Sequence, residues 1–241
     1  MLGTIAIVQA RMGSTRLPGK VLLPLAGVPM LRHVIERVRR ATRVDHVLVA
    51  TTTEAADEAI ATFCAEWGCA CFRGSEHDLL DRYYQAARTV PSEVVVRITS
   101  DCPLVDPGLI DRVLAEREEF AADYASNTYP VRTYPRGLCT EAFRFAALER
   151  AWGEAPDSSS REHVTPYIYR NPDRFHIHNV TNEEDCSAHR WTVDTVEDYA
   201  LVERIYGHFG HNRFDWKEAL ALLAANPAWS ELNAQVGQKA H

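Results

Sequence analysis

Apolar residues follow two alternating spacings along the first half of the chain. A short run of apolar and β-branched residues over 4–8 predicts a strand. Apolar side chains then recur three and four positions apart from Leu31 to Val38, which predicts an amphipathic helix over residues 30–40. The same alternation predicts strands over 46–50, 70–72 and 94–98 and helices around 60–67 and 79–87. Strands and helices alternating in this way predict an α/β fold, with a mostly parallel sheet covered by helices on both faces.

The pattern is less regular beyond residue 120. It predicts strands over 123–127, 175–180 and 190–193, a loop over 127–137, a helix entry at 158–160 and a last helix over 215–225. Thr195 and Asp198 have the spacing of a capping box, which predicts the start of a helix that runs to about residue 209. The tail after Pro227 is expected to be partly loose.

The charge balance limits the kinds of partner. The 241 residues include 26 Lys and Arg against 33 Asp and Glu, a formal net charge of −7, so an anionic ligand must be met by a local cluster of cations. Nucleic acid is therefore not an expected partner. No stretch approaches the roughly 18 apolar residues that span a membrane, and the first residues lack a basic leader, so we expect a cytoplasmic protein. The six cysteines show no C-x-x-C spacing, which disfavours a zinc knuckle.

A basic loop over residues 9–20 directly follows the first predicted strand. Ligands of open α/β sheets bind at this edge, beyond the carboxyl ends of the strands. Gly13 lets backbone N–H groups approach phosphate oxygens, while Arg11, Arg16 and Lys20 supply charge-assisted hydrogen bonds that suit a triphosphate. A basic surface loop with glycines for its turns is the alternative interpretation.

The spacing of this loop excludes two common phosphate-binding motifs. Five residues separate Gly13 from Gly19, and Val21 stands where a Walker loop needs Ser or Thr after its lysine. The dinucleotide pattern G-x-G-x-x-G is absent as well. Kinases and dehydrogenases are therefore disfavoured.

Two acidic residues follow apolar runs that should end at the same sheet edge. Asp101 comes after the run over 94–98, and Asp194 comes after the run over 190–193. Carboxylates beside substrate phosphates are the ligands that Mg²⁺ prefers, so both are candidate metal ligands. Each could instead act as a turn or helix-cap residue, Asp101 before Pro103 and Asp194 before the helix that follows it.

Residues 10–20 resemble the signature loop of CTP-dependent sugar-acid cytidylyltransferases, which include the Kdo and acylneuraminate enzymes. Four further segments resemble the SpsF-type branch that acts in spore-coat polysaccharide biosynthesis, and the resemblance extends to about residue 209. These segments are 72–75, 80–84, 126–128 and 160–166.

The resemblance implies a Rossmann-like nucleotidyltransferase fold related to the GT-A type, a Mg²⁺ cofactor and transfer of CMP from CTP with release of pyrophosphate. It implies catalytic roles for Arg11, Arg16, Lys20 and Asp101, and metal ligation by Asp101 and Asp194. The implied nucleotide contacts are Ala10, Arg11, Gly13, Ser14, Arg16, Lys20, Arg73, Ser75 and Asp101. We expect one domain over 1–241, with a nucleotide-binding half (1–120), an acceptor and dimerisation half (121–210) and a C-terminal helical tail (211–241). The resemblance also implies a homodimer.

The acceptor is less defined than the nucleotide. An anionic sugar acid, phosphosugar or phosphonate would suit the reaction, and the candidate contacts are Asn127, Glu141, Arg161, Glu162 and His163. Ser160 could simply cap a helix, with His163 a packed side chain. SpsF-type sequences commonly read D-G-L-D-V-E where residues 136–141 read R-G-L-C-T-E. This departure leaves three interpretations: a different acceptor, use of Glu141 instead, or impaired activity.

Two other functions fit part of the pattern. A GT-A-like glycosyltransferase would consume a nucleotide sugar, although no Asp-x-Asp motif is found after the predicted nucleotide site. A nucleotide-binding protein without turnover would account for the unusual segment over 136–140.

Overall fold

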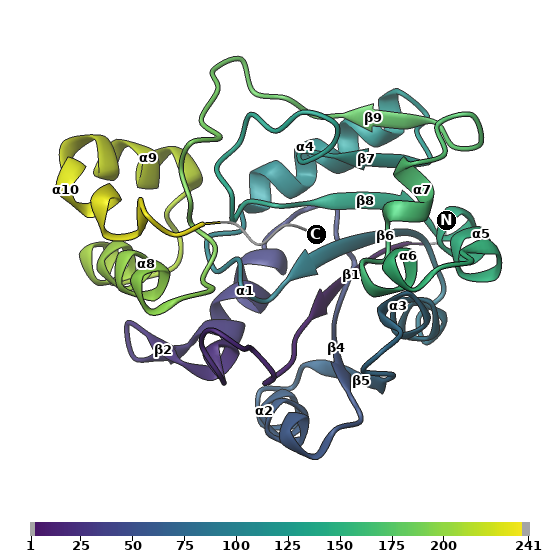
Figure 1. Ribbon diagram of the computed structural model, residues 1–241, viewed down its shortest axis with the longest axis horizontal. Coiled ribbons are helices and arrows are strands. Elements are labelled where there is room, and N and C mark those ends of the chain that lie inside the picture. The colour runs from purple at the N-terminus through teal and green to yellow at the C-terminus, as the bar shows by residue number, and fades with distance from the viewer. Residues whose placement is uncertain (1–2, 238–241) are drawn as a thin grey trace.

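A seven-stranded sheet forms the centre of the computed structural model, which describes residues 3–237 (Figure 1). The strand order is β5-β4-β1-β6-β8-β7-β9. The first four of these in space are parallel neighbours: β5 (Ala70–Gly74), β4 (His46–Thr52), β1 (Gly3–Gln9) and β6 (Ser92–Thr99). β8 (Glu141–Arg144) is antiparallel to β6 and to β7 (Tyr124–Ser126), and β7 is parallel to β9 (Ile177–Asn179). The mostly parallel sheet is therefore confirmed.

Helices cover both faces of this sheet, as predicted. Ile5 and Ile7 of β1 pack with α3 (Leu79–Arg88) and α5 (Phe145–Glu154). Ala6 and Val8 point to the other face and pack with α1 (Met30–Val38), α2 (Glu58–Glu66) and α4 (Pro107–Glu119). Successive side chains of a strand point to opposite faces, so these apolar strands are buried on both sides.

The remaining elements are short or lie near the C-terminus. They are β2 (Pro24–Leu25), β3 (Val28–Pro29), α6 (Ser158–Glu162), α7 (Pro166–Tyr169), α8 (Val196–Phe209), α9 (Trp216–Ala225), α10 (Pro227–Ser230) and the 3₁₀ turns η1 (Lys20–Leu22), η2 (Ala55–Asp57) and η3 (Glu231–Asn233). The predicted capping box is confirmed, because Thr195 and Asp198 satisfy each other's backbone at the start of α8. Helices α8, α9 and α10 lie together at one side of the molecule (Figure 1). No helix within residues 3–237 is long and apolar enough to cross a membrane.

The predicted strand over 190–193 is wrong. Within the described residues, this segment makes only an isolated parallel bridge, between Arg190 and Arg136. The Val193 N–H donates to the Asp101 carbonyl at 2.8 Å, and Thr192 Oγ1 donates to the same oxygen at 3.2 Å. The segment therefore closes the loop beyond β6 instead of extending the sheet.

The tail after Pro227 is not loose as far as residue 233. Asn233 is buried, and its Nδ2 donates to Asp198 Oδ1 at 2.8 Å and to the Arg190 carbonyl at 2.9 Å. Two amide hydrogen bonds to buried partners explain why this short stretch of chain packs against α8.

Three aromatic residues of the half for which dimerisation is expected pack within the chain. Tyr134 is buried and sits edge-on to Trp216, with ring centroids 5.5 Å apart. Tyr129 stacks on Tyr169 at 4.3 Å, and Trp152 stacks on Tyr84 at 4.2 Å. Local packing therefore accounts for these residues, and the homodimer stays a prediction.

Candidate active site

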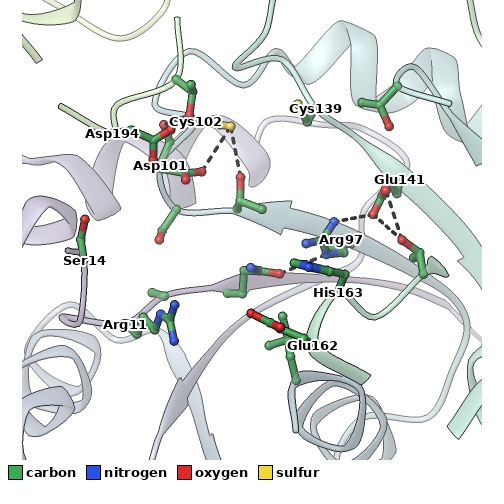
Figure 2. Close-up of a pocket in the computed structure, with 18 of the residues that line it drawn as sticks. Arg11, Ser14, Arg97, Asp101, Cys102, Cys139, Glu141, Glu162, His163 and Asp194 are labelled. Atoms are coloured by element: carbon green, nitrogen blue, oxygen red, sulfur yellow. Dashed lines mark hydrogen bonds and ion pairs between the residues drawn. The ribbon is translucent and has the colours of Figure 1, made fainter. Parts of the chain in front are cut away.

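A cavity of about 1020 Å³ opens at the carboxyl ends of β1 and β6 (Figure 2). The loop over 9–20, the end of β6, the start of α3, the segment over 128–141 and the region of α6 and α7 contribute its walls. The predicted site residues among its lining are Ala10, Arg11, Gly13, Ser14, Arg16, Lys20, Asp101, Glu141, Glu162, His163 and Asp194.

The 9–20 loop is held in shape by its own backbone. The Met12 carbonyl accepts from Ser14 N at 2.9 Å and from Gly19 N at 3.1 Å, so the loop closes on one oxygen. Gly19 has φ +70°, a conformation that glycine adopts without strain. Asp57 Oδ1 accepts from Met12 N at 2.6 Å and ties the loop to the start of α2. The loop therefore presents its cations from a fixed backbone.

Lys20 lies between the two candidate acids. It is 8% exposed, and its Nζ donates to Asp194 Oδ1 at 2.8 Å, to Asp101 Oδ2 at 3.3 Å and to the Val193 carbonyl at 2.7 Å. Burial disfavours the ammonium, but the two carboxylates outweigh this and raise the pKa of Lys20 above its ordinary value. Three residues distant in the sequence thus form one charged centre.

Asp194 has further cations around it. Its Oδ2 pairs with Arg16 Nη2 at 2.9 Å and with Arg190 Nη2 at 2.8 Å. Burial alone would raise its pKa, but Lys20 and the two guanidiniums lower it. Asp194 does not cap α8, because Thr195 does. Asp101 does not cap the helix after it either, since Asp106 caps α4. The cap interpretations of both acids are therefore excluded.

The donor set of these acids fits Mg²⁺. Both carboxylates converge on the position of one cation, the Lys20 ammonium, and oxygen ligands are what Mg²⁺ prefers. Within residues 3–237, no group of three or more His, Cys, Asp or Glu side chains forms an all-protein metal cage. Two carboxylates that leave the other positions to water and substrate phosphate match the usual way in which proteins hold this ion.

A family model described as cytidylyltransferase matches residues 5–225 of the chain. The protein belongs to the cytidylyltransferase family. It is therefore a nucleotidyltransferase, and its sheet and helices form the Rossmann-like fold of these enzymes.

Several related proteins and similar solved structures match most or all of the chain of this cytidylyltransferase. The spore coat polysaccharide biosynthesis protein SpsF of Bacillus subtilis is 34% identical over 92% of this chain and 94% of its own. An uncharacterised protein of Methanocaldococcus jannaschii is 38% identical, over 98% of this chain and 97% of its own. A cytidylyltransferase structure from Leptospira borgpetersenii superposes with TM-score 0.90 at 32% identity, covering 100% of both chains. A CMP:2-keto-3-deoxy-manno-octonic acid synthetase complexed with CTP shares the fold, with TM-score 0.64 at 21% identity over 86% of this chain and 99% of that one.

A largely buried ion pair between Arg97 and Glu141 lies on the side of the cavity away from Ser14 (Figure 2). Arg97 Nη1 donates to Glu141 Oε2 at 2.7 Å (Figure 2). Glu141 Oε1 also accepts from the Tyr124 hydroxyl at 3.1 Å. Thr165 Oγ1 lies 3.3 Å from both carboxylate oxygens. Glu141 lines the cavity but is 7% exposed, so its charge is already used to hold Arg97 in place. Glu162 and His163 line the cavity from the end of α6 and the residue after it, close to Thr165 in the sequence.

Four predicted contact residues are not among those that line the cavity. Arg73 pairs with Glu58 and donates to the Thr52 carbonyl, and Ser75 Oγ accepts from Asp78 N. Arg161 pairs with Asp78 at 2.7 Å. Asn127 is fully buried, and its amide braces the segment before β8 by donating to the Leu138 carbonyl and accepting from Thr140 N. In this structure these four side chains pair with other residues of the chain.

Arg82 is a lining residue that the sequence pattern does not indicate. It is 4% exposed, and its Nε and Nη1 are buried without a hydrogen-bond partner. Burial is the main cause that lowers its pKa, and Arg11 adds to it. A buried donor without a partner costs about 1–3 kcal/mol, so a group that lines a cavity in this state is well suited to meet a ligand.

The cavity is basic although the protein is acidic. Eight Arg and Lys side chains line it against five Asp and Glu, a surplus of three positive charges, while the whole chain has a net charge of −7. The local cation cluster expected for an anionic ligand is therefore present.

Proposed function

We propose that this cytidylyltransferase transfers CMP from CTP to a small anionic acceptor and releases pyrophosphate. The observation that carries the proposal is the contact of Lys20 Nζ with both Asp101 and Asp194, at the base of a cavity that the 9–20 loop borders. A phosphate-binding cation beside two carboxylates is what binding of a magnesium nucleotide requires.

The triphosphate would lie along Arg11, Arg16 and Lys20, which all line the cavity. The unpaired Nε and Nη1 of Arg82 would donate to an acceptor atom of the same nucleotide, which would satisfy two buried donors at once. Because the loop backbone is closed on Met12, these groups need little rearrangement when the nucleotide binds.

Asp101 and Asp194 would hold Mg²⁺, with Lys20 moving from the carboxylates onto a phosphate. The ion would neutralise phosphate charge. Arg190 and Arg16 would keep Asp194 in position through its second oxygen.

In the reaction, an acceptor oxygen attacks the α-phosphorus in line with the bond that breaks, and pyrophosphate leaves. Such transfers ask the protein for positioning and charge stabilisation more than for covalent chemistry. Arg11, Arg16 and Lys20 would stabilise the charge that develops on the leaving pyrophosphate. A sugar acid, a phosphosugar or a phosphonate would serve as acceptor, and likeness to SpsF favours a place in surface polysaccharide biosynthesis.

A pyrophosphate-release assay tests this proposal. CTP, UTP, ATP and GTP are each offered with Mg²⁺ and a panel of sugar acids, phosphosugars and phosphonates. We expect release with CTP, and Lys20→Ala should lower the rate by at least about 100-fold. Lys217→Ala, at an exposed lysine outside this cavity, is the matched control and should keep the rate. Undiminished release in Lys20→Ala would contradict the proposal, and nucleoside diphosphate release from a nucleotide sugar would favour a glycosyltransferase instead.

A further inference from the structure

Two arginines line the cavity from the segment that leads into β8, and they differ in their partners. Arg132 Nη1 donates to Cys139 Sγ at 3.3 Å. The Arg136 guanidinium makes no hydrogen bond or ion pair with any residue of the range 3–237 that the structure describes. Arg136 is half-buried, so its charge is only partly solvated.

The backbone of Arg136 is fixed. Its N–H donates to the His189 carbonyl at 2.9 Å, and its carbonyl accepts from Trp191 N at 2.6 Å. The next residue, Gly137, has φ +110°, and a Cβ there would lie 2.5 Å from the Trp191 carbonyl carbon. The backbone of Arg136 is thus attached to the segment that carries Asp194, so its side chain enters the cavity from a fixed point of the backbone.

The strongest electrostatic neighbours of Arg136 include no carboxylate. They are Arg132, Arg190 and the thiols of Cys139 and Cys102. Arg190 is itself paired with Asp194 and Asp198, and Cys139 already accepts from Arg132. Burial and then Arg132 lower the pKa of Arg136, which agrees with a guanidinium that lacks an anionic partner.

The surroundings of Arg136 are separate from the 9–20 loop. In Figure 2, Asp101 lies between Ser14 of the loop and Cys139, the residue that Arg132 contacts. Arg136 has Cys139 and Cys102 among its electrostatic neighbours, so an anion that it binds would lie on the Cys139 side of Asp101. The triphosphate of a nucleotide bound at the 9–20 loop would be neutralised by Arg11, Arg16 and Lys20 and would not need Arg136.

We propose that Arg136 binds an acidic group of the acceptor that takes no part in the reaction, distinct from the oxygen that attacks phosphorus. This inference rests on the proposed function and narrows its acceptor to compounds that keep a carboxylate or phosphate after CMP transfer. A guanidinium donates two parallel hydrogen bonds to either group, so both belong to the same class.

Equilibrium binding tests the proposal without turnover. The enzyme is first saturated with Mg²⁺ and a non-hydrolysable CTP analogue, which fills the phosphate loop. Two matched pairs of probes are then titrated by calorimetry: D-glucuronate against its methyl ester, and glucose 6-phosphate against glucose. We expect an acidic probe to bind at least tenfold more tightly than its neutral partner.

Variants assign this preference to one residue. Arg136→Gln should bring the acid-to-neutral ratio close to one, and Arg136→Glu should reverse it, with both variants keeping the affinity for the CTP analogue. Arg43→Gln removes an exposed guanidinium that pairs with Glu118 and should keep the wild-type ratio. Equal thermal midpoints check that the variants fold.

Two results would overturn the proposal: a wild-type enzyme without acid preference in either pair, or an Arg136→Gln enzyme that retains it. Pyrophosphate release is measured separately. An acid preference that depends on Arg136, without pyrophosphate release from any acceptor, would instead contradict the proposed function.

Discussion

The ammonium group of Lys20 lies between Asp101 and Asp194 and pairs with both carboxylates. Asp101 and Asp194 would repel each other if Lys20 were absent, since Asp101 has no other cation partner among the ion pairs of the described residues. The lysine that the sequence identifies as a phosphate contact therefore also holds Asp101 and Asp194 together.

This role predicts how the protein responds to metal removal. A chelator should leave the thermal midpoint of the wild-type protein unchanged, because Lys20 pairs with both acids and Arg16 and Arg190 also pair with Asp194. Lys20→Ala should lower the free energy of unfolding by about 2 kcal/mol, the value of a hydrogen bond to a charged group, and added Mg²⁺ should restore part of it. Urea unfolding with and without the chelator measures both effects. A chelator-sensitive wild type would contradict the prediction.

Single site residues can be predicted from the sequence only where their position relative to a strand or a motif indicates their role. The loop cations and the two strand-end acids could be predicted, because a parallel sheet places its strand ends at one edge. Arg82 could not be predicted, since on a helix it resembles a solvated charge, and only the packing of α3 against Gly74 buries it. Asn127 and Arg161 are predicted as acceptor contacts from their chemistry; in the structure they do not line the cavity and pair with Leu138 and Asp78 instead, so this role stays a prediction.

Elements with a regular apolar period were predictable, and short ones were not. The four parallel strands and α1 to α3 follow the period that their burial imposes. β8 spans four residues and contains the buried Glu141, so no apolar run indicates it. α4 does carry a start signal in the sequence, with Asp106 as the cap and Pro107 in the first turn.

His33 connects α1 to the chain around Asn212 in a single protonation state. Its Nε2 donates to the Leu25 carbonyl at 2.8 Å, and its Nδ1 accepts from Asn212 Nδ2 at 3.3 Å, which only the neutral ring can do. Burial is the main cause that lowers the pKa of His33 below 6.5.

A lowered folded-state pKa fixes the direction of the pH effect. The unfolded protein takes up this proton at a higher pH than the folded one, so the contribution of His33 is complete above about pH 6.5 and is lost as the pH falls below it. We expect the free energy of unfolding to fall between roughly pH 7 and pH 5, and His33→Gln should remove this component. Urea titrations across this range measure it, and identical slopes for the two proteins would contradict the assignment.

Gly137 should tolerate no side chain. Its φ of +110° and the 2.5 Å approach of a Cβ to Trp191 predict that Gly137→Ala destabilises the protein by roughly 1–3 kcal/mol or more. Gly153 in α5 is the matched control, because a Cβ there meets nothing within 4 Å, and Gly153→Ala should stabilise by about 0.5–1 kcal/mol. Thermal and urea unfolding compare the two. Equal effects would show that the Arg136–Arg190 bridge is less rigid than described.

At the scale of the whole molecule, the sequence pattern predicts the fold but not the distribution of charge over the surface. The core on both sheet faces follows from the sequence pattern, and α8 and α9 share the same core as β1 and β6. The division of charge between the cavity and the rest of the surface could not be predicted, because it depends on which side chains the topology gathers.

That division has a kinetic consequence. With +3 in the cavity and −7 overall, the remaining residues carry a formal charge of −10. At about 10 mM salt, where charges act over roughly 30 Å, an approaching nucleotide meets the repulsion of the whole molecule first. At about 100 mM the range falls to roughly 10 Å, and the cavity acts alone. The association rate of a fluorescent CTP analogue, measured by stopped flow, should therefore rise with salt over this interval, and a steady fall from the lowest salt would contradict it. Association of an anionic nucleotide should therefore be fastest when salt screens the negative charges outside the cavity.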